Sequence, residues 1–531
     1  MPILPDRLLL PGFVPTCVNA GAASLSALVV AVIGAACLFQ GPRGLLRAGA
    51  SRLAVSVLLG LGLAGAPGDG FAGAPPAGAA SSRQQGPRQE YRPSAGSATQ
   101  EKRALGKAVM FGVSALRNGY QGGGSPVGLR PAWQFPSPGT PAASEMEGAS
   151  VLSSPIVAGA DVFGASCVVE VLGNYGSVFC LDAASGRLRW KTEGYKDATG
   201  KEQQFRGFFS SPAVTADGKS LVIGQGLHPD EKCELLCFDT ATGRLRWHVP
   251  TPLHLESSPA IDGDFAVVGA GAVEDDNHKP KGHPGVVLAV KVSTGERLWE
   301  HPVIDPESSP AIADGIVYIG SGFNGKAVVA LRTESDDQLK KKGLERQAWR
   351  TPTPHPATGP VTLTDALVIV GCGNSDYVYT DPRPEGALVA LDRETGGVRW
   401  QLKMPDSVLG KVAVCEGRAV LAVRNGEVVC LDLNSTGGPR EVWRHRVHGD
   451  KPLLAGPAFT GACVYAVAGD GYLAVLDAKD GHELEHHGLN AKGRPGENSL
   501  CVSSPLVALG RVYVGSETGG LRCFVGKDVK P

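Results

Sequence analysis

Short apolar runs separated by turn residues recur along most of the chain. One copy opens with Ser210-Ser211-Pro212, passes through apolar runs that end at Gly224 and Asp239, turns at Thr242-Gly243 and finishes around Trp247. Runs of this length, bounded by Gly, Pro, Asp and Thr, predict β-strands joined by tight turns. Four such strands in sequence, repeated at a regular period, are typical of one blade of a β-propeller.

The number of copies predicts the number of blades. Ser-Ser-Pro also begins at Ser153, Ser257, Ser308 and Ser503, and degenerate copies begin at Thr358 and Ala455. A tryptophan marks the last strand of most copies, and the seven in the chain are Trp133, Trp190, Trp247, Trp299, Trp349, Trp400 and Trp443. An indole ring is large enough to bridge two neighbouring blades, so we assign all seven to blade docking.

The two ends of the repeat indicate how the ring closes. Trp133 has no blade in front of it, whereas the copy that begins at Ser503 supplies only three strands. In a further copy Glu485 replaces the tryptophan. We predict an all-β fold, an eight-bladed propeller of four-stranded antiparallel blades over residues 126–526. The strand around Trp133 closes it, because this closure hides both open sheet edges.

The N-terminal region has a different pattern. Residues 22–39 are almost purely apolar and long enough for a marginal membrane span, and a shorter apolar run covers residues 53–66. Two interpretations remain open for residues 1–66: one or two transmembrane segments, or a signal sequence that ends near Ala72-Gly73-Ala74. Both predict a periplasmic or other extracytoplasmic propeller, and an N-terminal segment that is not removed would be its contact with the membrane.

Residues 67–125 predict a linker. Most of this stretch is rich in Gly, Ala, Pro and Ser, which cannot bury enough apolar surface to order the chain, so we expect a disordered tether. Leu105, Val109, Val113 and Leu116 fall at helical spacing, which predicts one short amphipathic helix near 101–117.

Composition limits the kinds of partner and of covalent cross-link that we expect. Lys and Arg number 51 against 52 Asp and Glu, and no basic stripe is present, so we expect no nucleic-acid partner. Cys180, Cys237, Cys430 and Cys523 share one repeat position in apolar strands, which predicts buried free thiols rather than disulfides. A charge-rich insertion at 333–347 predicts a solvated loop.

The Asp-x-x-Thr-Gly turn followed by Trp, as at Asp239 and Asp392, resembles the repeat of the PQQ-repeat, or quinoprotein-like, propeller family. That family includes pyrroloquinoline-quinone (PQQ) dehydrogenases and a non-catalytic outer-membrane assembly lipoprotein type. The resemblance therefore implies the fold and leaves function open. Family enzymes hold the quinone between a tryptophan and a disulfide of two adjacent cysteines, with Ca²⁺ beside it. This chain has no adjacent cysteines and no Cys-x-x-Cys-His motif, so it looks more like the non-catalytic type.

Two matching segments place acidic residues at the predicted channel. His254 and Glu256 precede Ser-Ser-Pro in one blade, Asp305 and Glu307 hold the same positions in the next, and His355 stands near the corresponding place after that. First strands line a propeller channel, so we expect these five side chains at its mouth, with the loops at 228–230 and 373–376 on the same side. The cluster could bind Ca²⁺ through its oxygens, or its side chains could be hydrogen-bonded structural groups.

We therefore expect a monomeric, non-catalytic binding and scaffolding propeller of the cell envelope, with a protein or peptide partner and without catalytic residues, bound metal or cofactor. The alternative is a PQQ- or Ca²⁺-dependent oxidoreductase that uses His254, Glu256, Asp305 and Glu307.

Overall fold

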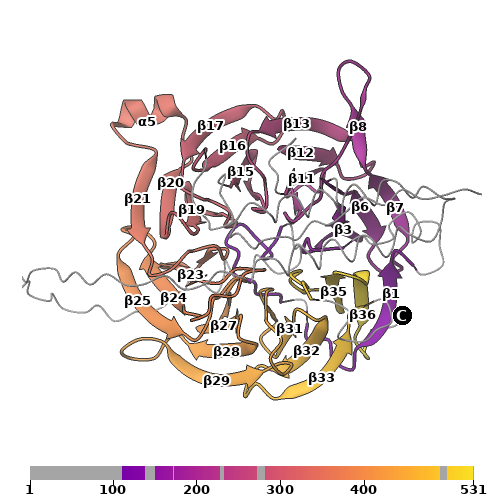
Figure 1. Ribbon diagram of the computed structural model, residues 1–531, viewed down its shortest axis with the longest axis vertical. Coiled ribbons are helices and arrows are strands. Elements are labelled where there is room, and N and C mark those ends of the chain that lie inside the picture. The colour runs from indigo at the N-terminus through magenta and orange to yellow at the C-terminus, as the bar shows by residue number, and fades with distance from the viewer. Residues whose placement is uncertain are drawn as a thin grey trace, which may run out of the picture. The chain divides into compact units, whose positions relative to one another are not determined.

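The computed structural model describes residues 110–122, 124–137, 150–170, 173–227, 233–271, 282–490 and 499–529. These residues form eight four-stranded antiparallel sheets around a common channel (Figure 1). Two small two-stranded sheets are added, and α5 (Asp336–Lys342) is the only helix in the described ranges. The predicted all-β, eight-bladed propeller is confirmed.

We number the blades in chain order, each from its innermost strand outward. Blade 1 contains β2 (Ile156–Ala158), β3 (Asp161–Ala165), β6 (Val178–Asp182) and β7 (Leu188–Thr192). Blade 2 contains β10 (Ala213–Val214), β11 (Ser220–Gln225), β12 (Cys233–Asp239) and β13 (Leu245–Thr251). Blade 3 contains β14 (Ala260–Asp262), β15 (Phe265–Ala270), β16 (Val286–Lys291) and β17 (Arg297–Pro302). Blade 4 contains β18 (Ala311–Ala313), β19 (Ile316–Ser321), β20 (Ala327–Arg332) and β21 (Gln347–Pro352).

The second half of the ring repeats this order. Blade 5 contains β22 (Thr362–Leu363), β23 (Leu367–Gly373), β24 (Gly386–Asp392) and β25 (Val398–Met404). Blade 6 contains β26 (Ala413–Cys415), β27 (Arg418–Val423), β28 (Glu427–Asp432) and β29 (Arg440–Arg446). Blade 7 contains β30 (Ala458–Phe459), β31 (Cys463–Val467), β32 (Tyr472–Asp477) and β33 (Glu483–Gly488). Blade 8 contains β34 (Leu506–Ala508), β35 (Arg511–Ser516), β36 (Gly520–Val525) and β1 (Arg130–Phe135).

Blade 8 joins the two ends of the repeat. Its sheet has the order β1-β36-β35-β34, and Trp133 lies opposite Cys523 in antiparallel register. The Trp133 indole N–H donates to the carbonyl of Ala183 in blade 1 at 3.2 Å, which carries the contact across the seam. The predicted closure by the strand around Trp133 is confirmed, and it leaves neither β1 nor β36 with an open inner edge.

The tryptophans of the outer strands contact the next blade. Trp190 Nε1 donates to Thr240 O at 2.7 Å, and Trp247 Nε1 donates to Val292 O at 2.7 Å. The ring of Trp190 packs on Gly243, where an added Cβ would lie 2.5 Å from the indole and the φ of 70° already favours glycine. The turn glycine thus serves both the turn and the neighbouring blade's tryptophan.

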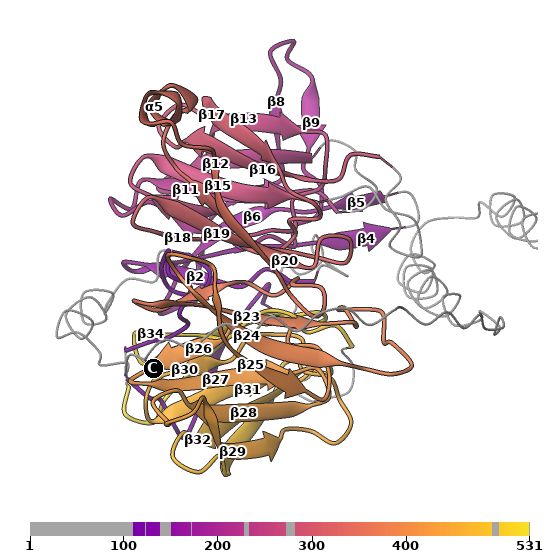
Figure 2. The same cartoon turned by 90° about the vertical axis from the view of Figure 1, so that its left-hand side faces the viewer.

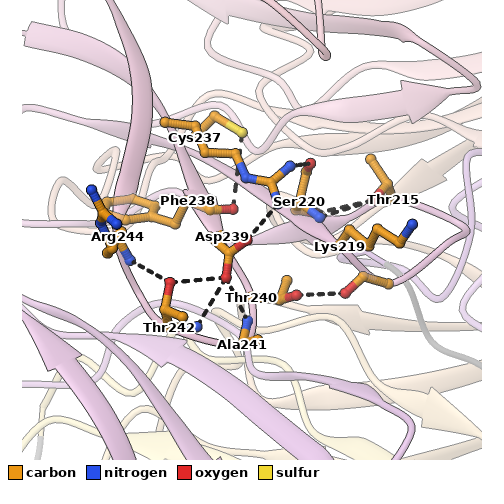
Figure 3. Close-up of polar contacts among 12 residues, drawn as sticks. Thr215, Lys219, Ser220, Cys237, Phe238, Asp239, Thr240, Ala241, Thr242 and Arg244 are labelled. Atoms are coloured by element: carbon orange, nitrogen blue, oxygen red, sulfur yellow. Dashed lines mark hydrogen bonds and ion pairs between the residues drawn. The ribbon is translucent and has the colours of Figure 1, made fainter.

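The preceding aspartate shapes that turn. The Asp239 carboxylate accepts hydrogen bonds from the backbone N–H groups of Ala241 and Thr242 and from the Thr242 hydroxyl (Figure 3). Asp392 binds the same groups of Glu394 and Thr395 in blade 5. These contacts explain why Asp and Thr recur together: the side chains satisfy turn amides that no strand can bond.

The repeated cysteines lie opposite the tryptophans. Cys180 pairs with Trp190, Cys237 with Trp247, Cys430 with Trp443 and Cys523 with Trp133, while alanine takes this position in blades 3, 4 and 5. All ten cysteines in the described ranges are buried thiols. A small side chain is needed there because the indole occupies the space beside it.

Serine hydroxyls tie the innermost strands together. Ser210 Oγ donates to Ser257 O and Ser257 Oγ donates to Ser308 O, both at 2.9 Å. Ser308 Oγ continues the series to Gly359 O at 2.9 Å. Gly359 therefore holds the first serine position in blade 5, one residue later than the degenerate copy predicted at Thr358.

The two faces of the ring differ in their connections. The strand pair β4 (Val168–Glu170) and β5 (Gly173–Tyr175) extends one face, which we call the mouth face, whereas β8 (Gly194–Lys196) and β9 (Glu202–Gln204) form a hairpin that projects outward from the rim of the ring (Figure 2). The opposite face carries the short turns between third and fourth strands and α5. The predicted loop at 333–347 is instead helical at 336–342, with a capping box between Ser335 and Gln338 and a left-handed Gly343 at its end.

Residues 110–121, which we call the strap, lie in the channel and contact the innermost strands. Of the helix expected near 101–117, residues 110–117 form turns and bends, because Gly112 and Val113 have positive φ and the strap's hydrogen bonds go to distant blades. The remaining part of that helix, the predicted membrane or signal region at 1–66 and most of the predicted tether lie outside the described residues. None of the described helices is long and apolar enough to span a membrane.

Candidate functional site

Eight equivalent residues, each just before the first serine position of its blade, surround one end of the channel. In blade order they are Leu152, Phe209, Glu256, Glu307, Thr358, Leu409, Leu454 and Val502. Five of these positions are apolar, two are acidic and one is a threonine. We call this ring of positions the mouth, and it divides into an apolar and an acidic side.

The apolar side closes over the channel axis. Leu409, Leu454 and Val502 are buried and pack with the half-buried Leu152 and Phe209. Phe209 of blade 2 and Leu409 of blade 6 come from opposite blades of the ring, so a cluster that contains both reaches the axis. Tyr377 joins it from the loop between β23 and β24, with its ring 5.3 Å from that of Phe209 in an edge arrangement. The Tyr377 hydroxyl lies 3.4 Å from Leu409 O.

The acidic side is built on a contact between blades 3 and 4. His254 is fully buried, and its Nε2 lies 2.9 Å from Oε1 of Glu307. Gly271 packs against this pair, since an added Cβ would lie 2.2 Å from His254 Nε2 and 2.9 Å from Glu307 Oε1. The buried imidazole therefore holds the Glu307 carboxylate in place at the half-buried edge of the mouth.

The two sides of the mouth act on each other electrostatically. Burial raises the pKa of Tyr377, and the negative charges of Glu256 and Glu307 raise it further. Both carboxylates therefore lie near the phenol, and Tyr377 remains a neutral hydroxyl at neutral pH. Glu256 also raises the pKa of the buried Cys167 thiol, although burial is the larger cause there.

The remaining predicted site residues are placed differently. Asp305 is buried, with a φ of 51°; its N–H donates to Pro284 O at 2.7 Å, and its carboxylate packs against Gly322. Burial lowers the pKa of His355, and its charged neighbours are Glu385, Lys326 and Lys403 rather than the mouth carboxylates. The structure brings together His254, Glu256 and Glu307 but gives His355 a separate surrounding.

Sequence reasoning missed two residues of the mouth and one below it. Phe209 and Tyr377 are the aromatic residues of its apolar side, although the Tyr377 loop was expected on this face through its residues 373–376. Lys411 holds the second serine position of blade 6 and is buried. Its signal was a lone lysine inside an apolar run, at a repeat position where five other blades have serine.

The aromatic residues of the mouth are not arranged like a quinone-stacking site. Within the described ranges, no three His, Cys, Asp or Glu side chains are placed to hold a metal ion. PQQ is a flat polycarboxylate, so two glutamates at the mouth repel it and the edge-on Phe209 and Tyr377 pair offers no flat floor. Six of the tryptophans donate their indole N–H to a neighbouring blade, and Trp400 packs in the core between blades 5 and 6.

Solved structures that match this chain include two dehydrogenases and BamB. A europium-containing methanol dehydrogenase matches at 14% identity with a TM-score of 0.57, covering 81% of this chain and 100% of that one. Quinohemoprotein alcohol dehydrogenase from Comamonas testosteroni matches at 14% identity with a TM-score of 0.52, covering 82% and 83%. BamB from Moraxella catarrhalis matches at 16% identity with a TM-score of 0.47, covering 69% and 95%. Identities this low establish the shared fold alone.

The match to a family is more informative. No curated protein matches the sequence. The model of the family described as outer membrane protein assembly factor BamB matches residues 130–383 and 384–529, which together span all eight blades. The resemblance to PQQ-repeat propellers noted from the Asp-x-x-Thr-Gly turns is confirmed, and the chain belongs to this BamB-like family of PQQ-repeat propellers.

Proposed function

We propose that the protein is a non-catalytic scaffold of the cell envelope that binds a protein partner at its mouth face. The observation that carries this proposal is the mixed character of the mouth. Half-buried aromatic and aliphatic side chains stand beside two carboxylates, and the loop that covers them continues into Val378 and Tyr379, which are 60% and 42% exposed. Apolar side chains exposed around a polar site are typical of protein interfaces.

The chemistry of the mouth indicates the kind of segment that it binds. An arginine or lysine side chain has an apolar stem and a cationic end, so its stem fits against Phe209 and Tyr377 while its charge lies near Glu256 and Glu307. We therefore propose an extended partner segment that carries a basic residue between apolar ones. The family's description as an outer membrane protein assembly factor supports a partner in the envelope.

Photo-crosslinking in the native host tests this proposal. A photoreactive amino acid at Val378 on the mouth face is compared with one at Leu509, which is 53% exposed in the turn between β34 and β35 on the opposite face. We expect a discrete protein adduct from position 378 and none from position 509. The double variant Glu256→Gln, Glu307→Gln should yield about tenfold less adduct, because it removes the attraction for a basic segment. Equal adducts from both positions, or an adduct indifferent to the double variant, would contradict the proposal.

A further inference from the structure

The strap passes through the channel and contacts the blades in chain order. It begins with Met110 paired to Ala213 of blade 2 and ends with Gln121, whose N–H donates to Phe459 O of blade 7 at 2.9 Å. Figure 1 shows it as the indigo trace at the centre of the ring. The strap therefore crosses the channel between the innermost strands of blades 2 and 7.

The strap supplies acceptors to the innermost strands. Ala115 O accepts from Ile312 N at 2.9 Å, Leu116 O accepts from Leu363 N at 2.9 Å, and Asn118 O accepts from Val414 N at 2.7 Å. The three donors are the second residues of β18, β22 and β26, so they are equivalent N–H groups on the channel edge of three blades. If the strap left the channel, these N–H groups would lose their hydrogen-bond acceptors.

The backbone of the strap is strained. Val113 has a φ of 81°, next to Gly112 at 75°, and Arg117 has a φ of 51°. A β-branched residue is a clear outlier in this region, because its side chain crowds the backbone. Such conformations persist only where surrounding contacts impose them, so the strap is held in its seat against its own preference.

Two buried cations lie at the strap, and neither has a carboxylate partner among the described residues. Arg117 donates to Phe111 O at 2.8 Å, Ser258 O at 2.6 Å and Pro259 O at 3.1 Å, and also to Pro310 O. Lys411 Nζ donates to Gly456 O at 3.2 Å and Pro457 O at 3.1 Å. Both cations lie over the Phe111 ring, at 5.5 and 5.6 Å from its centre. Carbonyls and one aromatic face only partly replace the water that these charges lose.

Lys411 is the titratable member of this pair. Burial alone lowers its pKa from 10.5 to about 7, with no contribution from a neighbouring charge. The groups packed against it are Phe111 and Gly119 of the strap and Gly456 and Pro457 of blade 7, and the other charged group on the same ring is Arg117. Arg117 stays charged at neutral pH, since burial lowers its pKa only to about 9.

We propose that the strap is a releasable plug, seated most firmly when Lys411 is neutral and loosened when Lys411 takes up a proton. Three features raise the free energy of the seated strap. They are the strain at Val113, the carbonyl-only surroundings of both cations and the Phe111 ring that the cations share. Loosening would uncover the channel-edge N–H groups of Ile312, Leu363 and Val414. This inference concerns the channel beneath the mouth and does not depend on what the mouth binds.

The direction of the pH dependence follows from proton linkage. In a released strap Lys411 meets water and regains its ordinary pKa of 10.5, whereas in the seat its pKa is about 7. The released state therefore takes up the proton first as the pH falls, and release becomes about tenfold more frequent for each pH unit between roughly pH 10 and pH 7. Below pH 7 both states carry the proton, so the dependence ends there.

Hydrogen exchange on the full-length protein tests the proposal. The amides of Ile312, Leu363 and Val414 are followed at pH 9 and pH 7, with rates corrected for the intrinsic pH dependence of exchange. We expect their protection to be roughly 50-fold lower at pH 7, following the linkage above. Amides within β16, which bond only inside blade 3, serve as the reference and should not change.

Lys411→Ser is the matched variant, because serine is the residue at this position in blades 1 to 4 and blade 8. We expect it to fold and to show the same strap protection at pH 9 and pH 7. If it fails to fold, Lys411→Met keeps the length of the side chain without its charge and should give the same result. Unchanged protection in the wild type, or the same pH effect in the variant, would overturn the proposal.

Discussion

The outer wall of the propeller and its channel follow opposite rules. Along the wall, one contact recurs with the same chemistry: an indole N–H donates to a carbonyl of the next blade, as Trp190 does to Thr240 and Trp443 does to Ala478. In the channel, the residue before the first serine position differs from blade to blade, from Leu152 to Glu307. Uniform positions hold the ring together, and the positions that break the repeat give the molecule its individual chemistry.

One exception on the wall has a structural cause. Glu485 stands where blade 7 should carry a tryptophan, and its Oε2 accepts from the N–H of Leu129 at 2.9 Å. The third and fourth strands of blade 8 come from opposite ends of the repeat, so no turn glycine is present for an indole to cover. The missing tryptophan therefore follows from the seam.

Removing one wall contact should have the largest effect. Trp247→Ala deletes the ring that packs on Gly295 and the hydrogen bond to Val292 O. We expect a loss of about 3 kcal/mol in the free energy of unfolding, because Trp247 is only half-buried and so falls at the low end for aromatic truncations. Urea denaturation of both proteins measures this difference. Leu298→Ala, at a side chain that is 38% exposed on β17, is the control and should change stability by less than about 0.5 kcal/mol.

A smaller loss is expected where the blades join near the channel. Ser257→Ala removes the donor to Ser308 O at 2.9 Å and the acceptor of Gly269 N at 3.2 Å, both in buried surroundings. Buried groups left without a partner cost about 1–3 kcal/mol, so we expect a loss near 1.5 kcal/mol by the same denaturation measurement. The exposed Ser293→Ala is the matched control. Equal effects at both serines would show that the inter-blade bond contributes nothing.

The smallest effect should come from restoring the repeat at its exception. Glu485→Trp brings back the residue of the other blades but loses the acceptor of Leu129 N. We expect a decrease of about 1 kcal/mol in the free energy of unfolding rather than a gain, because blade 8 has no glycine turn to receive the ring. Thermal denaturation decides the sign. A higher melting temperature would mean that the seam accepts a tryptophan after all.

The fold could be predicted because each blade repeats the same local signals. Asp239, Thr242 and Gly243 predict one turn, and Asp392, Thr395 and Gly396 predict the equivalent turn of blade 5. The adjacency of Glu256 and Glu307 was also predictable, since equivalent positions in consecutive blades become neighbours. Helix α5 also had signals in the sequence, namely Ser335 with Gln338 at its start and Gly343 at its end. The many charges of residues 333–347 predicted a solvated loop instead.

The strap and Tyr377 could not be predicted in the same way. Residues 110–117 continue an apolar spacing that suits a helix, yet their carbonyls bond to Ile312, Leu363 and Val414, far away in sequence. No local pattern records such partners. Tyr377 reaches the axis through a loop that no other blade shares, so counting repeats gives it no position.

The order of elements at the N-terminal end also sets a route for mechanical load. A pull on the chain before Met110 acts first on the strap within the ring and reaches β1 only after the strap has come free. The hydrogen bonds from Arg117 to Ser258 O and Pro259 O would then break before the pairing of β1 with β36, so the closing strand stays in place. Tension applied at the N-terminal end is therefore carried by the strap before it reaches the strand that closes the ring.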